Sequence, residues 1–370
     1  MLFLLLIFTG ATLFQILIWG TGFSLFSCAK GRSRWWSNPK QPLPAVSIVV
    51  CARNEAQHLR QHLPLLAAQE YGGDFEIVVV NDASSDETAQ VLIEQQECCA
   101  RLRTVHLAQK AGPGKKAALQ EGIAAAQFEW LLLTDADCAP ESNRWIAGMM
   151  AVAGTPSTEI VAGYAPCRAE DRAFFRYEVA FTALQYGAFA LWRFPYMATG
   201  RNMAWKKELF ARHRGFSAHS DLASGDDDLF VNTAATAGNL RLCLHPATFM
   251  CSAAPPDLTA WWRQKRRHLS AAPRYRTAHR LLLGAIALTH TLHYGLGVIL
   301  PAAAPACSPY VLALYVLRMA IAWPVALAGF NRLGERDLAV FFPWWDGWMA
   351  VWYGAGVPFL LWSRQSVAWK

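Results

Sequence analysis

Two aspartates separated by one residue, Asp135 and Asp137, come directly after an apolar run at residues 130–133. Because alternate residues of an extended chain point to the same side, both carboxylates can face one site. Carboxylate oxygens suit a hard cation such as Mg²⁺ or Mn²⁺. Such a cation beside a diphosphate would neutralise the charge that builds up on a leaving nucleoside diphosphate. The pair therefore predicts a divalent-metal site.

Three consecutive carboxylates, Asp226, Asp227 and Asp228, form an unbroken acidic run. Like charges this close repel one another unless a cation or a proton relieves the repulsion. One of them could take a proton from an acceptor hydroxyl as a general base. Taken alone, the run is explained equally well as the acidic start of a helix.

Lys115 and Lys116 follow Gly114 at the start of a predicted helix. Two cations at a helix N-terminus oppose the helix dipole, and an anionic ligand there would relieve the conflict. We therefore expect phosphate or diphosphate contact, with a solvated turn as the alternative. The spacing does not match a P-loop.

Asp82 lies just after another apolar run, within the polar segment 81–88. A carboxylate in this position can accept hydrogen bonds from a nucleotide base or a ribose. Ser85 or Asp86 would also cap the following helix. Ligand binding and capping are compatible, because the segment has more acceptors than one cap needs.

Residues 261–268 are aromatic at first and then strongly basic. A basic amphipathic helix that lies on anionic lipid is one interpretation. In the other, Gln264 and Arg267, which are one helical turn apart, face the diphosphate or the acceptor. The place of this segment, just before further apolar stretches, allows both.

The elements that must position these residues alternate between apolar runs and helical patterns. We expect strands at residues 46–51, 75–80, 102–106 and 130–134, and helices at 56–69, 88–97 and 115–126. Such alternation predicts a parallel sheet with helices on its faces. Ligands bind beyond the carboxyl ends of such strands, which is where the polar residues lie. We expect this α/β domain at residues 41–270, opened by a linker at 41–45.

The N-terminal residues 2–27 are almost wholly apolar, and about 20 such residues suffice to span a bilayer. The basic residues Lys30, Arg32 and Arg34 follow this run and do not precede it. This order favours an uncleaved anchor at residues 1–28 over a signal peptide. It also places the next domain on the cytoplasmic side.

The C-terminal part turns apolar again, with candidate spans at residues 281–300, 310–330 and 340–362. We therefore expect about three C-terminal transmembrane helices within residues 281–363. The third contains several tryptophans, which suit a re-entrant or interfacial position as an alternative. Buried helices of a soluble protein are the remaining interpretation.

The composition also points to a membrane protein. Hydrophobic residues make up 54% of the 370 residues and charged residues 16%, whereas about a quarter is usual for charged residues in soluble proteins. The net charge is +7, and basic residues cluster at 30–40 and 263–280, beside apolar segments. This favours membrane flanks over a nucleic-acid partner. The nine cysteines form no Cys-x-x-Cys pair, which favours reduced thiols over disulfides.

Taken in order, these segments resemble glycosyltransferase family 2, inverting enzymes with the GT-A fold, over about residues 45–270. Residues 46–55 resemble the family's opening strand with its Ala-Arg-Asn-Glu signature. Residues 81–88 resemble its Asp-Asp-x-Ser-x-Asp-x-Thr segment, whose second acid, Asp82 here, is implied to contact the nucleotide base. Asn81 replaces the usual first acid.

Later segments follow the family's order as well. Residues 200–204 resemble its Gly-x-Asn-x-Ala stretch by the acceptor site. Asp226 and Asp227 resemble the acidic pair that supplies the catalytic base, and Asp227 is the preferred member. Residues 264–268 resemble its Gln-x-x-Arg-Trp segment, but His268 stands where tryptophan is expected. That replacement makes a processive enzyme less expected.

The resemblance implies a role for each of these residues. Donor contacts are implied for Ala52, Asn54, Glu55, Asp82, Lys115, Lys116, Asp135, Gln264 and Arg267. Acceptor contacts are implied for Gly200, Asn202 and His268. Asp135 and Asp137 are the implied ligands of Mg²⁺ or Mn²⁺, and Asp227 or Asp226 is the implied base.

The expected function is therefore a membrane-bound inverting glycosyltransferase. It would move a sugar from a nucleotide-sugar donor to a lipid-linked or glycan acceptor at the cytoplasmic face of a bacterial inner membrane. A processive polysaccharide synthase subunit is the first alternative. A sugar nucleotidyltransferase is less favoured, because residues 51–55 replace the glycine-rich basic loop that such enzymes usually have after the first strand. A non-catalytic membrane scaffold is less favoured, because it gives no reason for Asp135, Asp137 and residues 226–228 to lie at loop positions.

Overall fold

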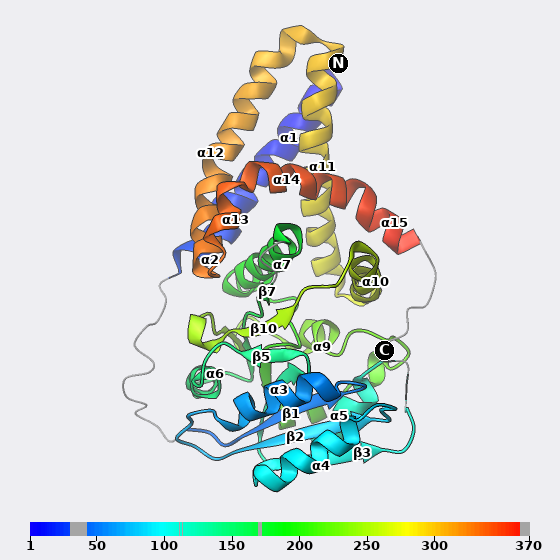
Figure 1. Ribbon diagram of the computed structural model, residues 1–370. Helices are drawn as coiled ribbons and strands as arrows, with labels where there is room; N and C mark the ends of the chain where they lie inside the picture. The colour runs from blue at the N-terminus through cyan, green and yellow to red at the C-terminus, as the bar shows by residue number, and fades with distance from the viewer. Residues whose placement is uncertain (30–42, 111, 113, 169–171, 363–370) are drawn as a thin grey trace.

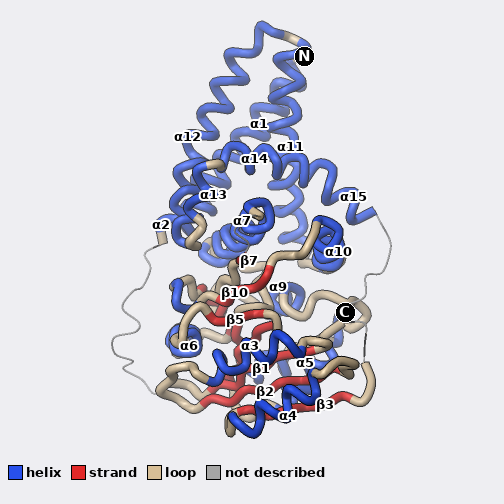
Figure 2. The backbone as a smooth tube through the Cα atoms, viewed as in Figure 1, coloured by secondary structure: helices blue, strands red, loops and turns tan. Residues whose placement is uncertain are grey.

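The structure is a computed structural model that describes residues 1–29, 43–110, 112, 114–168 and 172–362 (Figure 1). The basic cluster at residues 30–40, the start of the linker at 41–45 and the last residues of the 281–363 segment lie outside the described residues. Figure 2 shows that the strands gather at one end of the molecule, whereas the other end is helical.

Within the described residues, seven strands form the main sheet in the order β3-β2-β1-β4-β8-β6-β9. The four predicted strands are its parallel half: β1 (Val46–Ala52), β2 (Phe75–Asp82), β3 (Leu102–Leu107) and β4 (Trp130–Asp135). The other half consists of β8 (Met203–Lys206), β6 (Ile160–Ala162) and β9 (Leu240–Leu242). Strand β8 runs antiparallel to both β4 and β6, so the sheet is mixed and mostly parallel.

Helices cover both faces of the parallel half, as the alternation predicts. One face packs against α3 (Ala56–Ala67), α4 (Thr88–Cys98) and α6 (Trp145–Ala153). The other face packs against α5 (Lys116–Ala125), α8 (Lys207–Arg212) and α9 (Asp228–Ala234). Every residue of β1 is buried as a result, which explains why this strand reads as a continuous apolar run. The close approach of α5 requires Gly122, where a Cβ would lie 2.7 Å from Val49.

A second layer lies between the main sheet and the apolar helices (Figure 1). It contains a small sheet of β5 (Cys138–Pro140), β10 (Met250–Ala253) and β7 (Cys167–Arg168). It also contains α7 (Ala173–Leu191) and α10 (Leu258–Leu269). The ion pair of Lys265 with Glu178 joins these two helices.

Three helices of the described residues are long and apolar enough to cross a membrane. The first is Leu2–Cys28, which comprises α1 (Leu2–Ile18), a π-helical turn (Trp19–Phe23) and α2 (Ser24–Cys28). The others include α11 (Thr277–Ala303) and α12 (Ser308–Arg332). Figure 1 shows all three side by side, pointing away from the main sheet.

Among the described residues, no third C-terminal helix is long and apolar enough to cross a membrane; the segment expected to span, or to be re-entrant or interfacial, is divided into short helices. The segment forms α13 (Arg336–Val340), α14 (Phe342–Val351), a π-helical turn (Trp352–Gly356) and α15 (Val357–Trp362). It runs across the helical bundle and not along it (Figure 1). Pro343 begins a new helix at α14, as proline often does at a first helical position. Tryptophans, glycines and Asp346 further lower the hydropathy of the segment.

Candidate active site

The carboxyl ends of β1, β2 and β4 meet at one edge of the sheet. Cys51 of β1 pairs with Asp135 at the end of β4, and Ala52 pairs with Asn81 near the end of β2. The polar residues that follow these strands are thereby brought to the same edge, as expected for a parallel sheet.

The turns after β1 and β2 are fastened to each other. Asn54 has a φ of 56°, and its backbone N–H donates to Ser84 Oγ at 3.0 Å. Its side-chain oxygen accepts from the backbone N–H of Ser85 at 2.8 Å, and the backbone N–H of Glu55 donates to Thr88 Oγ1 at 3.0 Å. Ala52 is fully buried beneath this junction. The Ala-Arg-Asn-Glu segment therefore shapes the wall around Asp82.

Asp82 is buried at the end of β2, and its Oδ2 has no hydrogen-bond partner among the described residues. Arg53 NH1 lies 4.0 Å from that oxygen and donates to the Asp82 carbonyl at 3.3 Å. Burial raises the pKa of Asp82, and the charge of Arg53 only partly offsets this. An acceptor left unpaired in this way is suited to N–H or O–H donors of a ligand.

Lys115, just before α5, is the cation between two acidic segments. Its Nζ donates to Asp135 Oδ1 at 2.6 Å and lies 3.0 Å from Asp226 Oδ2. Burial alone lowers the pKa of Lys115, but Asp135, Asp226 and Asp227 together hold it well above its usual value. Lys115 therefore stays charged and links the end of β4 to the start of α9.

Asp227 lines a small cavity together with Lys115, Asp135, Gly200 and Asp226. Its Oδ2 accepts from the backbone N–H of Gly200 at 2.7 Å. A Cβ at Gly200 would lie 3.1 Å from that oxygen, so glycine permits this close approach. Burial, followed by the charge of Asp226, raises the pKa of Asp227. A carboxylate with a raised pKa is better suited to accept a proton from a hydroxyl.

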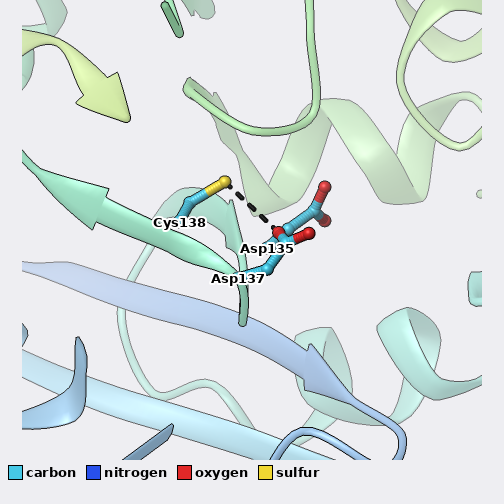
Figure 3. A group of neighbouring side chains, drawn as sticks. All are labelled: Asp135, Asp137 and Cys138. Carbon is cyan, nitrogen blue, oxygen red and sulfur yellow. Dashed lines mark hydrogen bonds between the residues drawn. The ribbon is translucent and has the colours of Figure 1, made fainter. Parts of the chain in front are cut away.

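Asp135, Asp137 and Cys138 offer ligand atoms that lie within 4.8 Å of one another. Figure 3 shows the two carboxylates close together beyond the end of β4, with the Cys138 thiol directed at Asp137. Burial, followed by the charge of Asp137, raises the pKa of Cys138 well above its usual value. The thiol stays protonated, so the donor set for a hard cation is the two carboxylates. These residues fit Mg²⁺ or Mn²⁺.

Arg201 is a site residue that the sequence motifs did not single out. Its guanidinium donates to Ser252 Oγ. Burial lowers the pKa of Arg201, but Cys138, Asp135 and Asp137 raise it overall, which places its charge beside the candidate metal ligands. It occupies the variable position of the Gly-x-Asn-x-Ala stretch, where a family pattern carries no signal.

Helix α10 contributes to the same electrostatic environment. Burial raises the pKa of Asp135, but Lys115, followed by Arg201 and Arg267, lowers it below its usual value. His268 is exposed to solvent on the same helix. Gln264 is half-buried on the same helix.

Two predicted ligand contacts need correction. Asn202 is fully buried, and its Nδ2 donates to the carbonyls of Tyr164 and Thr248 at 2.7 and 2.8 Å. Its Oδ1 accepts from Trp145 Nε1 at 2.9 Å. Asn202 therefore joins three segments and cannot reach an acceptor in this conformation.

Lys116 also differs from the prediction of a donor contact. It is buried, and its Nζ donates to the carbonyls of His219 and Leu222 at 2.5 and 2.8 Å. Lys116 thus fastens the loop before the acidic run, while its neighbour Lys115 faces the carboxylates.

The first prediction concerns Asn202. Asn202→Ala leaves the Trp145 N–H and the Thr248 carbonyl without their partners and removes one of two donors to the Tyr164 carbonyl, so we expect the unfolding free energy to fall by about 2–4 kcal/mol. Thermal unfolding of the purified protein in detergent measures this. Asn143→Ala, which removes one exposed hydrogen bond to Glu70, is the matched control. If Asn202→Ala had a normal melting temperature and a raised acceptor KM, Asn202 would instead be assigned to the acceptor site.

The second prediction concerns Asp228, which accepts from Tyr275 OH at 2.6 Å. Burial, followed by the charge of Asp227, raises the pKa of Asp228 to about 8. An unfolded aspartate loses its proton near pH ~4. Between these values the folded state binds more protons, so stability falls as pH rises from about 4 to about 8. Asp228→Asn should flatten this fall in melting temperature, and parallel curves for the variant and wild type would contradict the assignment.

Comparison with known proteins agrees with this geometry. A family model described as "Glycosyltransferase like family 2" matches residues 44–271. The chain is 28% identical over 247 residues to "Probable glycosyltransferase YdaM" of Bacillus subtilis (strain 168), covering 63% of this chain and 56% of that protein. It is 28% identical over 154 residues to "Beta-monoglucosyldiacylglycerol synthase" of Trichormus variabilis, covering 38% of this chain and 33% of the relative. The matches thus span about half and a third of these relatives.

Among solved structures, a mannosyltransferase from Pyrobaculum calidifontis, in complex with GDP-Man and Mn²⁺, has a similar fold. The TM-score is 0.57 at 23% identity, over 93% of this chain and 98% of that chain. At this identity the likeness concerns the fold. Because the family model covers more than half of the residues and the solved structure shares the fold, the chain belongs to glycosyltransferase family 2 and is a transferase with the GT-A fold.

Proposed function

We propose that this protein is a membrane-bound inverting glycosyltransferase that moves a sugar from a nucleotide-sugar donor to a lipid-linked acceptor. The observation that carries the proposal is the meeting of Asp135, Asp226 and Asp227 around Lys115 in one cavity. Nucleotide sugars are anionic at the diphosphate and polar at the base. The site offers cations for the diphosphate, and for the base it offers Asp82 Oδ2, which has no hydrogen-bond partner among the described residues.

The donor is proposed to lie along the carboxyl edge of the sheet. Asp82 would accept hydrogen bonds from the nucleoside, while Lys115, Arg201 and Arg267 would face the diphosphate. Asp135 and Asp137 would hold Mg²⁺ or Mn²⁺, which when bound stabilises negative charge on the leaving diphosphate. The segment that contains Asn54 and Glu55 would border the nucleoside of the donor.

Asp227 is proposed as the general base. It would take the proton of the acceptor hydroxyl while the hydroxyl oxygen forms a bond to the anomeric carbon. The bond from that carbon to the donor phosphate breaks, and nucleoside diphosphate leaves. A single displacement inverts the anomeric configuration. Asp226, which is bound to Lys115, is placed to hold that lysine and is the second choice for the base.

The acceptor is proposed to come from the membrane. Three candidate spans lie on the side of α10 that faces away from the sheet, and the name of the Trichormus relative indicates a glycerolipid product. His268, at the position where processive members carry tryptophan, favours single transfer over chain extension. The proposed location is a bacterial inner membrane with the site on the cytoplasmic side.

The third prediction tests the base. Asp227→Asn should lower the turnover number by about 10²- to 10⁴-fold, because proton abstraction is lost, while affinity for nucleoside diphosphate stays within about threefold. Turnover is measured from nucleoside diphosphate release, and affinity by calorimetry with added Mn²⁺. Asp74→Asn, the same change at the opposite edge of the sheet, is the control. Near-normal turnover by Asp227→Asn would transfer the role to Asp226.

The reaction class needs a separate experiment. Membranes that contain the protein are incubated with a panel of radiolabelled nucleotide sugars, and lipid is then extracted. Label in a lipid product, with free nucleoside diphosphate, supports the proposal. Release of pyrophosphate would indicate a nucleotidyltransferase, and label in a polymer would indicate a polysaccharide synthase.

A further inference from the structure

A charged pair lies inside the apolar helical bundle. Arg318 of α12 and Asp346 of α14 are both fully buried. At 1.5 Å per residue, Arg318 is about 15 Å from Ser308 along the helix axis, which is near the middle of the apolar helix α12. Ionisable residues inside an apolar membrane helix are costly and are retained where they have a specific role.

Contacts from the neighbouring helices hold the pair, although Arg318 Nε is buried without a hydrogen-bond partner among the described residues. Arg318 NH1 donates to Asp346 Oδ2, and NH2 lies 3.2 Å from Oδ1, so the contact is bidentate. Tyr294 OH donates to Asp346 Oδ2 at 2.6 Å. His290 Nε2 donates to the Asp346 carbonyl at 2.9 Å. The amide oxygen of Gln15 lies 3.4 Å from Arg318 NH2. Residues of α1, α11, α12 and α14 thus meet at one point.

The contacts of Asp346 explain how α14 is held in place. This helix crosses the bundle (Figure 1), so it is not aligned with the spans along its length. Asp346 is the residue through which α14 makes charge-assisted hydrogen bonds with both α11 and α12. Removing one member of such a buried pair leaves the other charge buried without its partner, which is strongly destabilising.

Aromatic contacts connect α14 and the turn that follows it with α7 and α10. Trp345 stacks on Tyr177 of α7, with 5.4 Å between ring centroids. Trp352 follows α14. Its ring centroid lies 4.9 Å from that of Trp261 and 5.6 Å from that of Trp262. Both of these tryptophans belong to α10, the helix that carries Arg267 and His268. A shift of α14 would therefore be transmitted to α10 through large buried rings.

We propose that the Arg318–Asp346 pair positions α10 beside the candidate active site. The two residues touch no reacting atom, so they are positioning residues. They fix α14 in the bundle, and the tryptophan contacts then set the position of Arg267 and His268. The kinetic consequence rests on the proposed function, because it concerns the membrane-derived acceptor.

The structural test is hydrogen exchange of the full chain in lipid nanodiscs. Asp346→Ala should speed exchange at residues 258–269 and 342–351 by about tenfold or more, because local opening becomes easier. Exchange at residues 46–52 of β1 should stay unchanged. The double variant Arg318→Met/Asp346→Leu, which removes both charges, should exchange more slowly at these sites than Asp346→Ala does. Arg60→Ala, which breaks an exposed ion pair with Glu87, is the control.

Two exchange results would overturn the proposal. One is normal exchange of α10 in folded Asp346→Ala, and the other is faster exchange of β1 to the same degree, which would indicate general loss of stability. If Asp346→Ala does not fold, Asp346→Asn replaces it, with a smaller increase expected at the same helices.

The kinetic test compares the KM of the acceptor with the KM of the nucleotide-sugar donor. Asp346→Asn should raise the acceptor KM at least about threefold while the nucleotide-sugar KM stays near that of wild type. Equal changes in both constants would contradict positioning of α10. If the wild-type protein itself transfers no sugar, the proposed function fails, but the exchange result still decides whether the pair positions α10.

Discussion

Electrostatic repulsion among carboxylates is the constraint on which the arrangement of the α/β domain around its candidate active site depends. Asp135 and Asp226 belong to segments far apart in the sequence, and Lys115 lies between them at hydrogen-bonding distance. Without a cation at this point, the end of β4 and the start of α9 would repel each other. Arg201 and Arg267 add positive charge near Asp135. Positive and negative side chains thus alternate at this edge of the sheet, which is the charge pattern on which the proposed donor site rests.

The parallel half of the sheet could be predicted from the sequence because its signals are local. Strands β1, β2 and β4 are largely apolar runs, and the polar residues of the site follow them directly. The other half could not be predicted in this way. Strands β6 and β9 have three residues each, which is too short for a periodic pattern. Helix α7 is buried on most sides, so it shows no amphipathic signal.

The errors within the site also have a physical reason. A motif gives the position of a residue in the sequence but not the direction of its side chain. Lys115 and Lys116 are adjacent, and successive residues of a helix differ by about 100° in direction, so one lysine faces the carboxylates and the other the 219–222 loop. Asn202 likewise points into the protein interior, although it is close in sequence to Gly200, which contacts Asp227.

The expected third span shows why composition alone is insufficient near a membrane. Asp346 interrupts an apolar segment, and only the three-dimensional arrangement reveals its partner Arg318, which is in another helix. The same charge that lowers the hydropathy of the segment allows α14 to lie across the bundle at a fixed place. The tryptophans of α10 pack against Trp352, which follows α14. Under the proposal that the pair positions α10, the place of Arg267 beside Asp135 therefore depends on where α14 is held.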